Sequence, residues 1–476
     1  MFKKLLFLSL FSVTTIALVY SVSFAQNKQP IAELEPFKKD DRVLICSPHP
    51  DDETICCAGV IQQALAAGAK VKIVYLTNGD ANELAFIVYE KRLTFKKKEF
   101  LHMGQVRMQE AIAATKVLGL KESDLIFLGY PDLSTFKIFS QYWQKDKPRI
   151  GVFTKATNVP YKQNFSFGAP YIGESILADL EKILLNYKPN KIFVSHPEDV
   201  NRDHKAFYLF LQVALLDLKK DIKPPKVYPY LTHCVGWPLP HHYHPELNLK
   251  PPEKFSGTEI NWQELELSSK EVDKKYHALL AHKSQTESSA FYLSAFVRKN
   301  ELFSDYPEIE LERQAFQKGK ETSFSGLSKM VESSENEERE SLNTYPEDQG
   351  TAGYAVADDS LFIRVQKTKK LGSTFGAQIY LFGYSEKMPF AQMPKIRIIT
   401  THKEFIVFDK RTKINPSGVS LDFGSNVWIL RVPLKMLGYP QFILTFMKTY
   451  GVTLPEESIG FRRLRIKQRE IGSLFF

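Results

Sequence analysis

One imidazole and three carboxylates lie within five residues of this chain, at His49, Asp51, Asp52 and Glu53. They directly follow an apolar run, residues 42–46, with the composition of a β-strand. Zinc binds neutral imidazole and carboxylate, and hydrolysis at a zinc ion also uses a nearby carboxylate that is not bound to the metal. The run therefore indicates metal-assisted hydrolysis. A solvated acidic turn that caps the next helix is equally compatible with these residues alone.

A second cluster of ionisable residues, at positions 196–204, follows another β-type run at residues 191–195 and ends in Asp203 and His204. Two such units, each a strand followed by metal-binding residue types, would bring both clusters to one edge of the same sheet, where open α/β sheets bind their ligands. His204 alone is also compatible with a surface histidine in the first turn of a helix. Its pairing with the first cluster favours a metal ligand.

Together the two clusters resemble the PIG-L/LmbE family of zinc-dependent N-acetylglucosaminyl de-N-acetylases. That family carries a His-Pro-Asp-Asp motif early and an Asp-x-His-x-Asp-His-like motif later. Further similar stretches lie at residues 107–111, 127–132, 230–233, 237–238 and 283–285. The resemblance covers about residues 40–305. It implies an α/β fold with a Rossmann-like, mostly parallel sheet and helices on both faces.

The resemblance also implies roles for individual residues. His49, Asp52 and His204 would bind zinc, and three protein ligands leave a fourth position for water, as a catalytic zinc requires. Asp51 would be the free carboxylate that deprotonates this water as general base and passes the proton to the departing amine. Glu53 would cap or orient the loop.

One position departs from the family pattern. Members often have a histidine three residues before the last ligand, where it stabilises the oxyanion of the tetrahedral intermediate. This chain has Asn201 there. An amide N–H can still donate to an oxyanion, so a catalytic role is one reading of Asn201. The other, equally compatible with its place before an apolar helix, is a helix N-cap. The departure concerns acid catalysis rather than metal binding.

Arg107, Asp132 and His233 complete the predicted site as substrate-binding residues. By analogy with the family, Arg107 and Asp132 would line the sugar pocket and hold hydroxyl or phosphate groups. The alternative for Arg107 is an ion pair with Glu110 or a neighbouring residue on the helix surface. His233 follows a strand-like run and can reach the site, and a core or rim histidine is its alternative.

Other metal-binding residue types carry weaker signals. Three histidines at positions 241, 242 and 244 are flanked by prolines, which predicts a loop rather than a metal cluster. The four cysteines are too few for a disulfide scaffold and lack the CxxC spacing of a zinc site. We expect them to be small buried hydrophobic residues.

The first 25 residues have the order of a secretory signal peptide. Lys3 and Lys4 precede an apolar segment at residues 5–20, and Ser23-Phe24-Ala25 forms a small-residue cleavage site. We expect cleavage and export to the periplasm or the medium. The alternative is an uncleaved N-terminal anchor, because the apolar segment is near the length that spans a bilayer.

The remaining chain is too long for one average domain. Residues 26–318 begin with a strand, helix, strand pattern typical of a βαβ unit and form the predicted deacetylase domain. Residues 319–350 are rich in Ser, Glu, Lys and Gly and predict a charged, flexible linker. Residues 351–476 contain six short β-type runs and predict a smaller, C-terminal antiparallel β-sandwich.

Charge and aromatic residues say less about partners. The formal charge of +9 is spread along the chain without a basic stripe interleaved with aromatics, so no nucleic-acid partner is expected. A contact with the cell envelope or a membrane surface is compatible with this charge. Tyr380, Phe382, Tyr384 and Trp428 of the predicted sandwich could offer flat faces to carbohydrate, but their alternation favours packing. The sequence does not indicate an oligomeric state.

These observations converge on an exported zinc hydrolase that removes the acetyl group from an N-acetylated amino sugar in a glycan, glycolipid or thiol–sugar conjugate. One alternative is a zinc-containing glycan-binding protein without turnover, which Asn201 favours and the retained Asp51 opposes. Another is the same zinc chemistry on a different amide.

Overall fold

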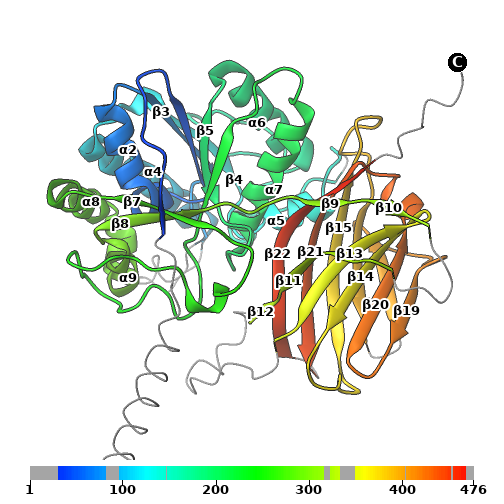
Figure 1. Cartoon of the computed structure of the whole chain (residues 1–476). Coiled ribbons are helices and arrows are strands. Elements are labelled where there is room, and N and C mark those ends of the chain that lie inside the picture. Colours follow the sequence, from blue (N-terminus) through cyan, green and yellow to red (C-terminus); the bar gives the residue numbers. More distant parts are fainter. Residues whose placement is uncertain are drawn as a thin grey trace, which may run out of the picture.

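The computed structural model describes residues 31–81, 96–145, 147–315, 322–332, 349–401, 404–451 and 454–467. An α/β part and a C-terminal β part lie side by side (Figure 1). Every predicted site residue lies in the α/β part. The predicted signal peptide lies outside the described residues.

A five-stranded, parallel sheet forms the centre of the α/β part, in the order β4-β3-β2-β5-β6. Its strands are β2 (Arg42–Ser47), β3 (Lys70–Thr77), β4 (Leu125–Tyr130), β5 (Lys191–Ser195) and β6 (Lys226–Tyr230). Val43 and Ile45 of β2 enter one core and Leu44 and Cys46 the other. Strands buried on both faces are apolar throughout rather than alternating. The predicted Rossmann-like sheet is confirmed.

The strand order decides where a ligand can bind. β2 is central, β3 and β4 extend the sheet on one side, and β5 and β6 extend it on the other. The topological switch point therefore lies between β2 and β5, which is where open α/β sheets bind their ligands. Both predicted clusters start at the carboxyl ends of these two strands.

Helices cover both faces of the sheet (Figure 1). α2 (Asp52–Ala66), α4 (Lys97–Leu118) and α8 (Ser269–Ala281) share one core, and α5 (Thr135–Gln141), α6 (Gly173–Tyr187) and α7 (Arg202–Asp217) share the other. α9 (Lys283–Leu293) follows α8, and β1 (Ala32–Glu33), β7 (Trp262–Glu266) and β8 (Asn300–Ser304) form a small separate sheet. Short 3₁₀ helices lie at Glu122–Asp124, Glu253–Phe255, Ser294–Phe296 and Leu434–Leu437. All four cysteines are buried and free of disulfides, in line with the expectation that they pack as small hydrophobic residues.

The C-terminal part is a β-sandwich, as predicted. One sheet has the order β10-β13-β14-β20-β19, with β11 also paired to β13. The other has the order β12-β22-β21-β15-β16-β17-β18, with β9 also paired to β22. Ile363 and Leu430 of the first sheet share a core with Ile379 and Ile396 of the second. The strands are β9 (Ile309–Leu311), β10 (Arg313–Gln314), β11 (Ser325–Lys329), β12 (Val331–Glu332), β13 (Thr351–Ala357), β14 (Ser360–Gln366), β15 (Gly376–Tyr384), β16 (Lys395–Thr400), β17 (Phe405–Asp409), β18 (Thr412–Ile414), β19 (Ser420–Phe423), β20 (Val427–Pro433), β21 (Phe442–Gly451) and β22 (Leu454–Ile466).

The sandwich begins earlier than the sequence predicts. β9 and β10 precede residue 318, and β11 and β12 lie inside the predicted linker 319–350. β11 pairs with β13 and β12 pairs with β22, so the described part of that segment belongs to the sheets. β11 (SGLSK) and β12 (VE) are short and contain few large apolar residues, so their composition resembles that of a linker. Residues 316–321 and 333–348 lie outside the described residues.

The eight-stranded sheet of the sandwich packs against α5 and α7. Phe139 of α5 contacts Phe382 of β15, with ring centroids 5.2 Å apart, and Phe210 of α7, with centroids 4.9 Å apart. Phe382 and Tyr384 are buried in this interface, and Trp428 is buried inside the sandwich. These aromatic residues therefore serve packing, which was the favoured expectation from their alternation.

Candidate functional site

The candidate residues come together at the carboxyl edge of the parallel sheet. His49 and Asp51 follow β2, and Asp52 begins α2. The loop after β5 and the first turn of α7 carry the second cluster, including His204, and His233 follows β6. Segments more than 150 residues apart in the chain therefore meet around one point, as the contact between His204 and His49 shows.

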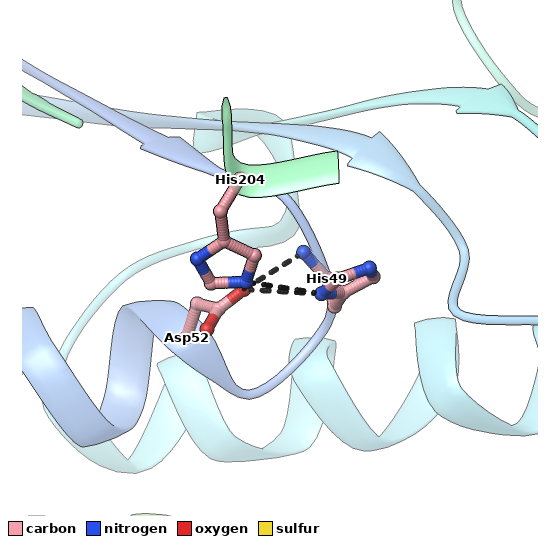
Figure 2. A group of neighbouring side chains, drawn as sticks. All are labelled: His49, Asp52 and His204. Carbon is pink, nitrogen blue, oxygen red and sulfur yellow. Dashed lines mark hydrogen bonds and ion pairs between the residues drawn. The ribbon is translucent and has the colours of Figure 1, made fainter. Parts of the chain in front are cut away.

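Figure 2 shows how His49, Asp52 and His204 face one another. His204 Nε2 lies 3.3 Å from His49 Nδ1 and 3.2 Å from Asp52 Oδ2, and His49 Nδ1 lies 3.5 Å from the same Asp52 oxygen. Bonds of about 2.0–2.1 Å at tetrahedral angles place neighbouring zinc ligands about 3.3 Å apart. The spacing and the chemistry of these three donor atoms thus fit one zinc ion, with a fourth position left for a small ligand.

Carboxylates hold the outer nitrogen of each histidine. His49 Nε2 lies 3.2 Å from Asp132 Oδ1 and 3.6 Å from Asp203 Oδ2. His204 Nδ1 lies 3.2 Å from Asp199 Oδ2. A proton on the nitrogen that faces each carboxylate would leave the lone pair of the inner nitrogen pointing into the site, an arrangement typical of metal-binding histidines.

The same carboxylates make the pocket attract a cation. Burial would lower the pKa of His204, but the carboxylates of Asp199 and Asp52 raise the pKa to about 9. Burial would raise the pKa of Asp52, but His204 and His49 hold the pKa well below its usual range. Negative charge in a buried pocket is balanced either by protons on the histidines or by a metal ion, and metal binding releases those protons.

Asp51 stands beside this donor set in an unusual backbone conformation. Its φ of 134° lies in a region that non-glycine residues rarely adopt, and such strain is concentrated at functional sites. Its carboxylate lies 3.2 Å from Arg107 Nη2. Burial raises the pKa of Asp51 to about 6, although Arg107 opposes this rise. A carboxylate with this pKa is ionised at neutral pH and can still accept and return a proton.

Arg107 is buried rather than open to solvent. Besides Asp51, its guanidinium donates to the carbonyl of Pro50 over 2.7 Å and to that of Gly79 over 3.0 Å. Gly79 has a φ of 64°, and a Cβ there would lie 2.0 Å from Arg107 Nη1, so only glycine allows this approach. The ion pair with Glu110 on the helix surface is not formed, since Glu110 accepts from Ser284 instead. Contact between Arg107 and a sugar stays a prediction.

Glu53 orients the loop, as predicted, and a distant histidine holds Glu53. Glu53 Oε2 accepts the main-chain N–H of Asp51 over 2.9 Å. Glu53 Oε1 accepts from Thr54 Oγ1 over 2.6 Å and lies 3.1 Å from His282 Nε2. His282 follows α8, 229 residues along the chain from Glu53. All three side chains are buried, so the backbone of Asp51 is tied to the α8–α9 junction.

The three other predicted residues, Asp132, His233 and Asn201, also lie at this edge of the sheet, and each has identified contacts there. Asp132 sits behind His49 and accepts the N–H of Ala81 over 3.1 Å. His233 is about one-third exposed, lies 3.3 Å from Asp199 through its Nδ1, and packs edge-on against His204. Asn201 caps α7 by accepting the N–H of Asp203 over 2.8 Å, so its N-cap role is present. Its role toward an oxyanion stays a prediction.

Sequence reasoning assigned no role to four groups that the structure brings to the site. Asp199 and Asp203 lie within the second cluster, so their position close to His204 in the sequence could have indicated a role in the site. Asp80 is buried, accepts from Tyr161 Oη over 2.6 Å, and has its pKa raised to about 7 by burial and by the nearby Asp132. His282 gave no local signal, because it reaches the site only through folding. Among the described residues, histidines 241, 242 and 244 belong to none of the candidate metal clusters.

Comparison with known proteins gives a family match over part of the chain. Residues 44–215 match the model of the PIG-L family, described as GlcNAc-PI de-N-acetylase. A curated relative from Bacillus anthracis, "Probable N-acetyl-alpha-D-glucosaminyl L-malate deacetylase 2", is 35% identical over 95 residues. That match covers 20% of this chain and 38% of the relative, so the chain spans well under half of the relative's length.

Several solved structures are similar over about half of the chain. A conserved protein from Thermus thermophilus is 19% identical, with a TM-score of 0.32, and the match covers 54% of this chain and 84% of that one. The N,N'-diacetylchitobiose deacetylase from Pyrococcus horikoshii is 18% identical, with a TM-score of 0.32, and the match covers 52% and 72%.

Proposed function

We propose, from the match of residues 44–215 to the PIG-L family model, that this chain is an exported zinc-dependent hydrolase that removes the acetyl group from an N-acetylglucosamine-type sugar. The observation that carries the proposal is the donor set of His49, Asp52 and His204, with spacings of 3.2–3.5 Å. A separate carboxylate, Asp51, directly precedes Asp52 and is close enough to His49 and Asp52 to feel their charges. A purely structural zinc site has no use for such a carboxylate.

Bound zinc would polarise the amide carbonyl and lower the pKa of a water molecule. The residues of the chain do the rest. Asp51 accepts the proton of that water and later delivers it to the nitrogen of the departing amine. Arg107 keeps the carboxylate of Asp51 in place, and Glu53 holds its main chain. Asp132, Asp199 and Asp203 orient the two histidines. The products are acetate and a free amino sugar.

The substrate class follows from the family and its curated relative and remains a proposal. The family is described as a GlcNAc-PI de-N-acetylase, and the relative as a deacetylase of an N-acetyl-glucosaminyl malate. An N-acetylated amino sugar in a glycan, glycolipid or thiol–sugar conjugate is therefore the first substrate to test. A glycan-binding protein without turnover, favoured by Asn201 in place of the family's histidine, is the second candidate. Another amide as substrate is the third.

Export is proposed from residues 1–25 alone, which lie outside the described part of the chain. Periplasmic or secreted location after cleavage, or retention by an uncleaved anchor, would bring the enzyme to envelope sugars. Within the described residues, none of the helices combines the length and apolar character needed to cross a membrane.

The decisive test compares the wild-type protein with Asp51→Asn for bound zinc and for acetate release from N-acetylglucosamine-containing substrates. One zinc per chain in both proteins, with acetate release lost only in the variant, supports the mechanism. Bound zinc without acetate release from the wild type points to the second or third candidate. A wild-type protein that binds no zinc refutes the proposal.

A further inference from the structure

The loop that carries the second half of the metal site is held from behind by the β-sandwich. Glu198 lies one residue before Asp199, which orients His204. Its Oε1 accepts the main-chain N–H of Gly460, on β22 of the sandwich, over 2.6 Å. The same oxygen accepts from Tyr306 Oη over 2.8 Å. Two donors from outside the loop thus fix the side chain next to Asp199.

Contact between Gly460 and this loop is as close as a main chain allows. A Cβ at Gly460 would lie 2.6 Å from the carbonyl oxygen of Pro197 and 2.6 Å from Cδ of Glu198. Tyr306 is itself covered by the guanidinium of Arg462, which lies 4.4 Å from the ring centroid. β22 therefore packs directly against residues 197 and 198 and leaves no space for this loop to move toward the sandwich.

Further contacts follow α7 from end to end. In the first turn of α7, Lys205 directly follows His204 in the sequence. Its Nζ lies 4.7 Å from the ring centroid of Phe446 on β21. Near the middle, Gln212 Oε1 accepts from Arg463 Nη1 of β22 over 3.0 Å. At the end, Asp217 Oδ1 accepts from Tyr384 Oη of β15 over 2.8 Å. The sandwich is thus docked along the helix that presents His204.

We propose that the C-terminal β-sandwich is a brace for the metal site, which positions Asp199 and His204 by holding residues 197–217 through Gly460 and the neighbouring strands. Its buried aromatic residues support this role, because Phe382 and Tyr384 face the α/β part rather than solvent. In this view the accessory domain raises zinc affinity by preorganising two members of the site, since supports behind metal ligands tune their orientation. Glu198 and Gly460 are positioning residues, and their role presupposes the proposed metal site.

Gly460→Ala in the full-length protein tests the brace. Because Gly460 does not have a positive φ, the added methyl group brings no left-handed backbone strain, and the atoms nearest to it belong to Pro197 and Glu198. We expect the Kd for zinc, measured by competition with a chromophoric chelator, to rise about 10-fold, the lower end of the effect of residues behind metal ligands. The matched control is Gly376→Ala, whose methyl group would lie 2.6 Å from the carbonyl oxygen of Thr400 inside the sandwich. It should lower stability and leave the Kd unchanged.

Glu198 provides an independent pair of variants should Gly460→Ala fail to fold. Glu198→Ala removes the oxygen that accepts the N–H of Gly460 and should raise the Kd for zinc. Glu198→Gln keeps an oxygen acceptor, so its Kd for zinc should stay close to that of the wild type. If the added methyl group acted only on folding stability, both Gly460→Ala and Gly376→Ala would unfold at a lower denaturant concentration. The two variants would then have the same Kd for zinc, which would contradict the brace.

The outcomes separate this inference from the proposed function. Zinc bound by the wild type without acetate release refutes the deacetylase while the Kd series still decides the brace. Equal Kd values in wild type, Gly460→Ala and Glu198→Ala overturn the brace, whatever the activity. A wild-type protein that does not bind zinc overturns both.

Discussion

Asp199 is the carboxylate on which the second half of the site is centred, and its replacement by asparagine is the sharpest single perturbation. The side chain is fully buried. Oδ1 accepts from the N–H of Asn201 over 2.9 Å and lies 3.3 Å from His233 Nδ1. Oδ2 accepts from the N–H groups of Thr232 and His233 over 3.1 and 2.9 Å and lies 3.2 Å from His204 Nδ1. Every neighbour of the carboxylate is thus a nitrogen that can donate.

Asparagine has the same shape but carries one amide nitrogen and no charge. Whichever way the amide turns, its NH₂ group faces at least two of these donors, and the partner of His204 is no longer negative. Loss of a carboxylate behind a metal-binding histidine typically weakens metal affinity about 10- to 100-fold, which corresponds to about 1.4–2.8 kcal/mol. Buried donors left without an acceptor cost about 1–3 kcal/mol each in folding stability.

We therefore expect Asp199→Asn to raise the Kd for zinc at least about 10-fold and to lower the free energy of unfolding. Chelator competition measures the first and urea titration the second. Asp41→Asn is the matched control, because Asp41 is also buried and accepts from Lys38 and Asn190 and pairs with Lys191. It lies just before β2, at the opposite end of the sheet. Wild-type zinc affinity in Asp199→Asn, or an equal loss in Asp41→Asn, would refute the reasoning.

Three further predictions use other buried groups. His282→Ala frees Glu53 and should lower kcat about 10-fold or more through displacement of the base, with zinc content unchanged; His282→Gln, which keeps a donor, should recover most of it. Asp80 has a raised pKa of about 7, against an ordinary value of 3.8, so between these values the folded state holds a proton that the unfolded state has lost. Stability should therefore fall as the pH rises from about 4 to about 7, by up to about 1.4 kcal/mol per pH unit for this group. Urea titrations of Asp80→Asn should show a shallower slope than the wild type, since Asp51, with a pKa of about 6, keeps its own share. Burial lowers the pKa of Lys395, which donates to two main-chain carbonyls between the sandwich and α5. The unfolded state then binds the extra proton, so wild-type stability should rise relative to Lys395→Met from pH 7 toward pH 10, and parallel curves would contradict this.

Local patterns in the chain were sufficient for the central strands of the parallel sheet and for the metal-binding residue types that follow them. Apolar runs at residues 42–46 and 191–195 became strands because an uninterrupted β-branched and aliphatic run can be satisfied only by burial on both faces. The first cluster lies within one loop and one helical turn, so the chain itself keeps His49 and Asp52 close together, and the family resemblance predicted that both bind the metal. Asn201 caps α7 because a short amide side chain before an apolar helix satisfies a free N–H.

Other features depended on contacts that no local pattern specifies. The ion pair of Arg107 with Asp51 was not predicted, and it forms because Gly79 leaves room for the guanidinium to turn inward. His282 meets Glu53 across 229 residues. The edge strands β11 and β12 were assigned to a linker, because they are short and contain few apolar residues, whereas their pairing with β13 and β22 is decided by the fold.

One physical cause separates the features that local sequence patterns predicted from those that they did not. Side-chain periodicity reports which faces of a strand or helix are buried, and this is a property of neighbouring residues. Which distant segments meet depends on the sum of many weak contacts, such as those that dock β15, β21 and β22 along α7. The sequence therefore shows the metal-binding residue types in two short clusters. Only the tertiary structure determines which carboxylate supports each histidine, and only the tertiary structure places the sandwich behind the second cluster.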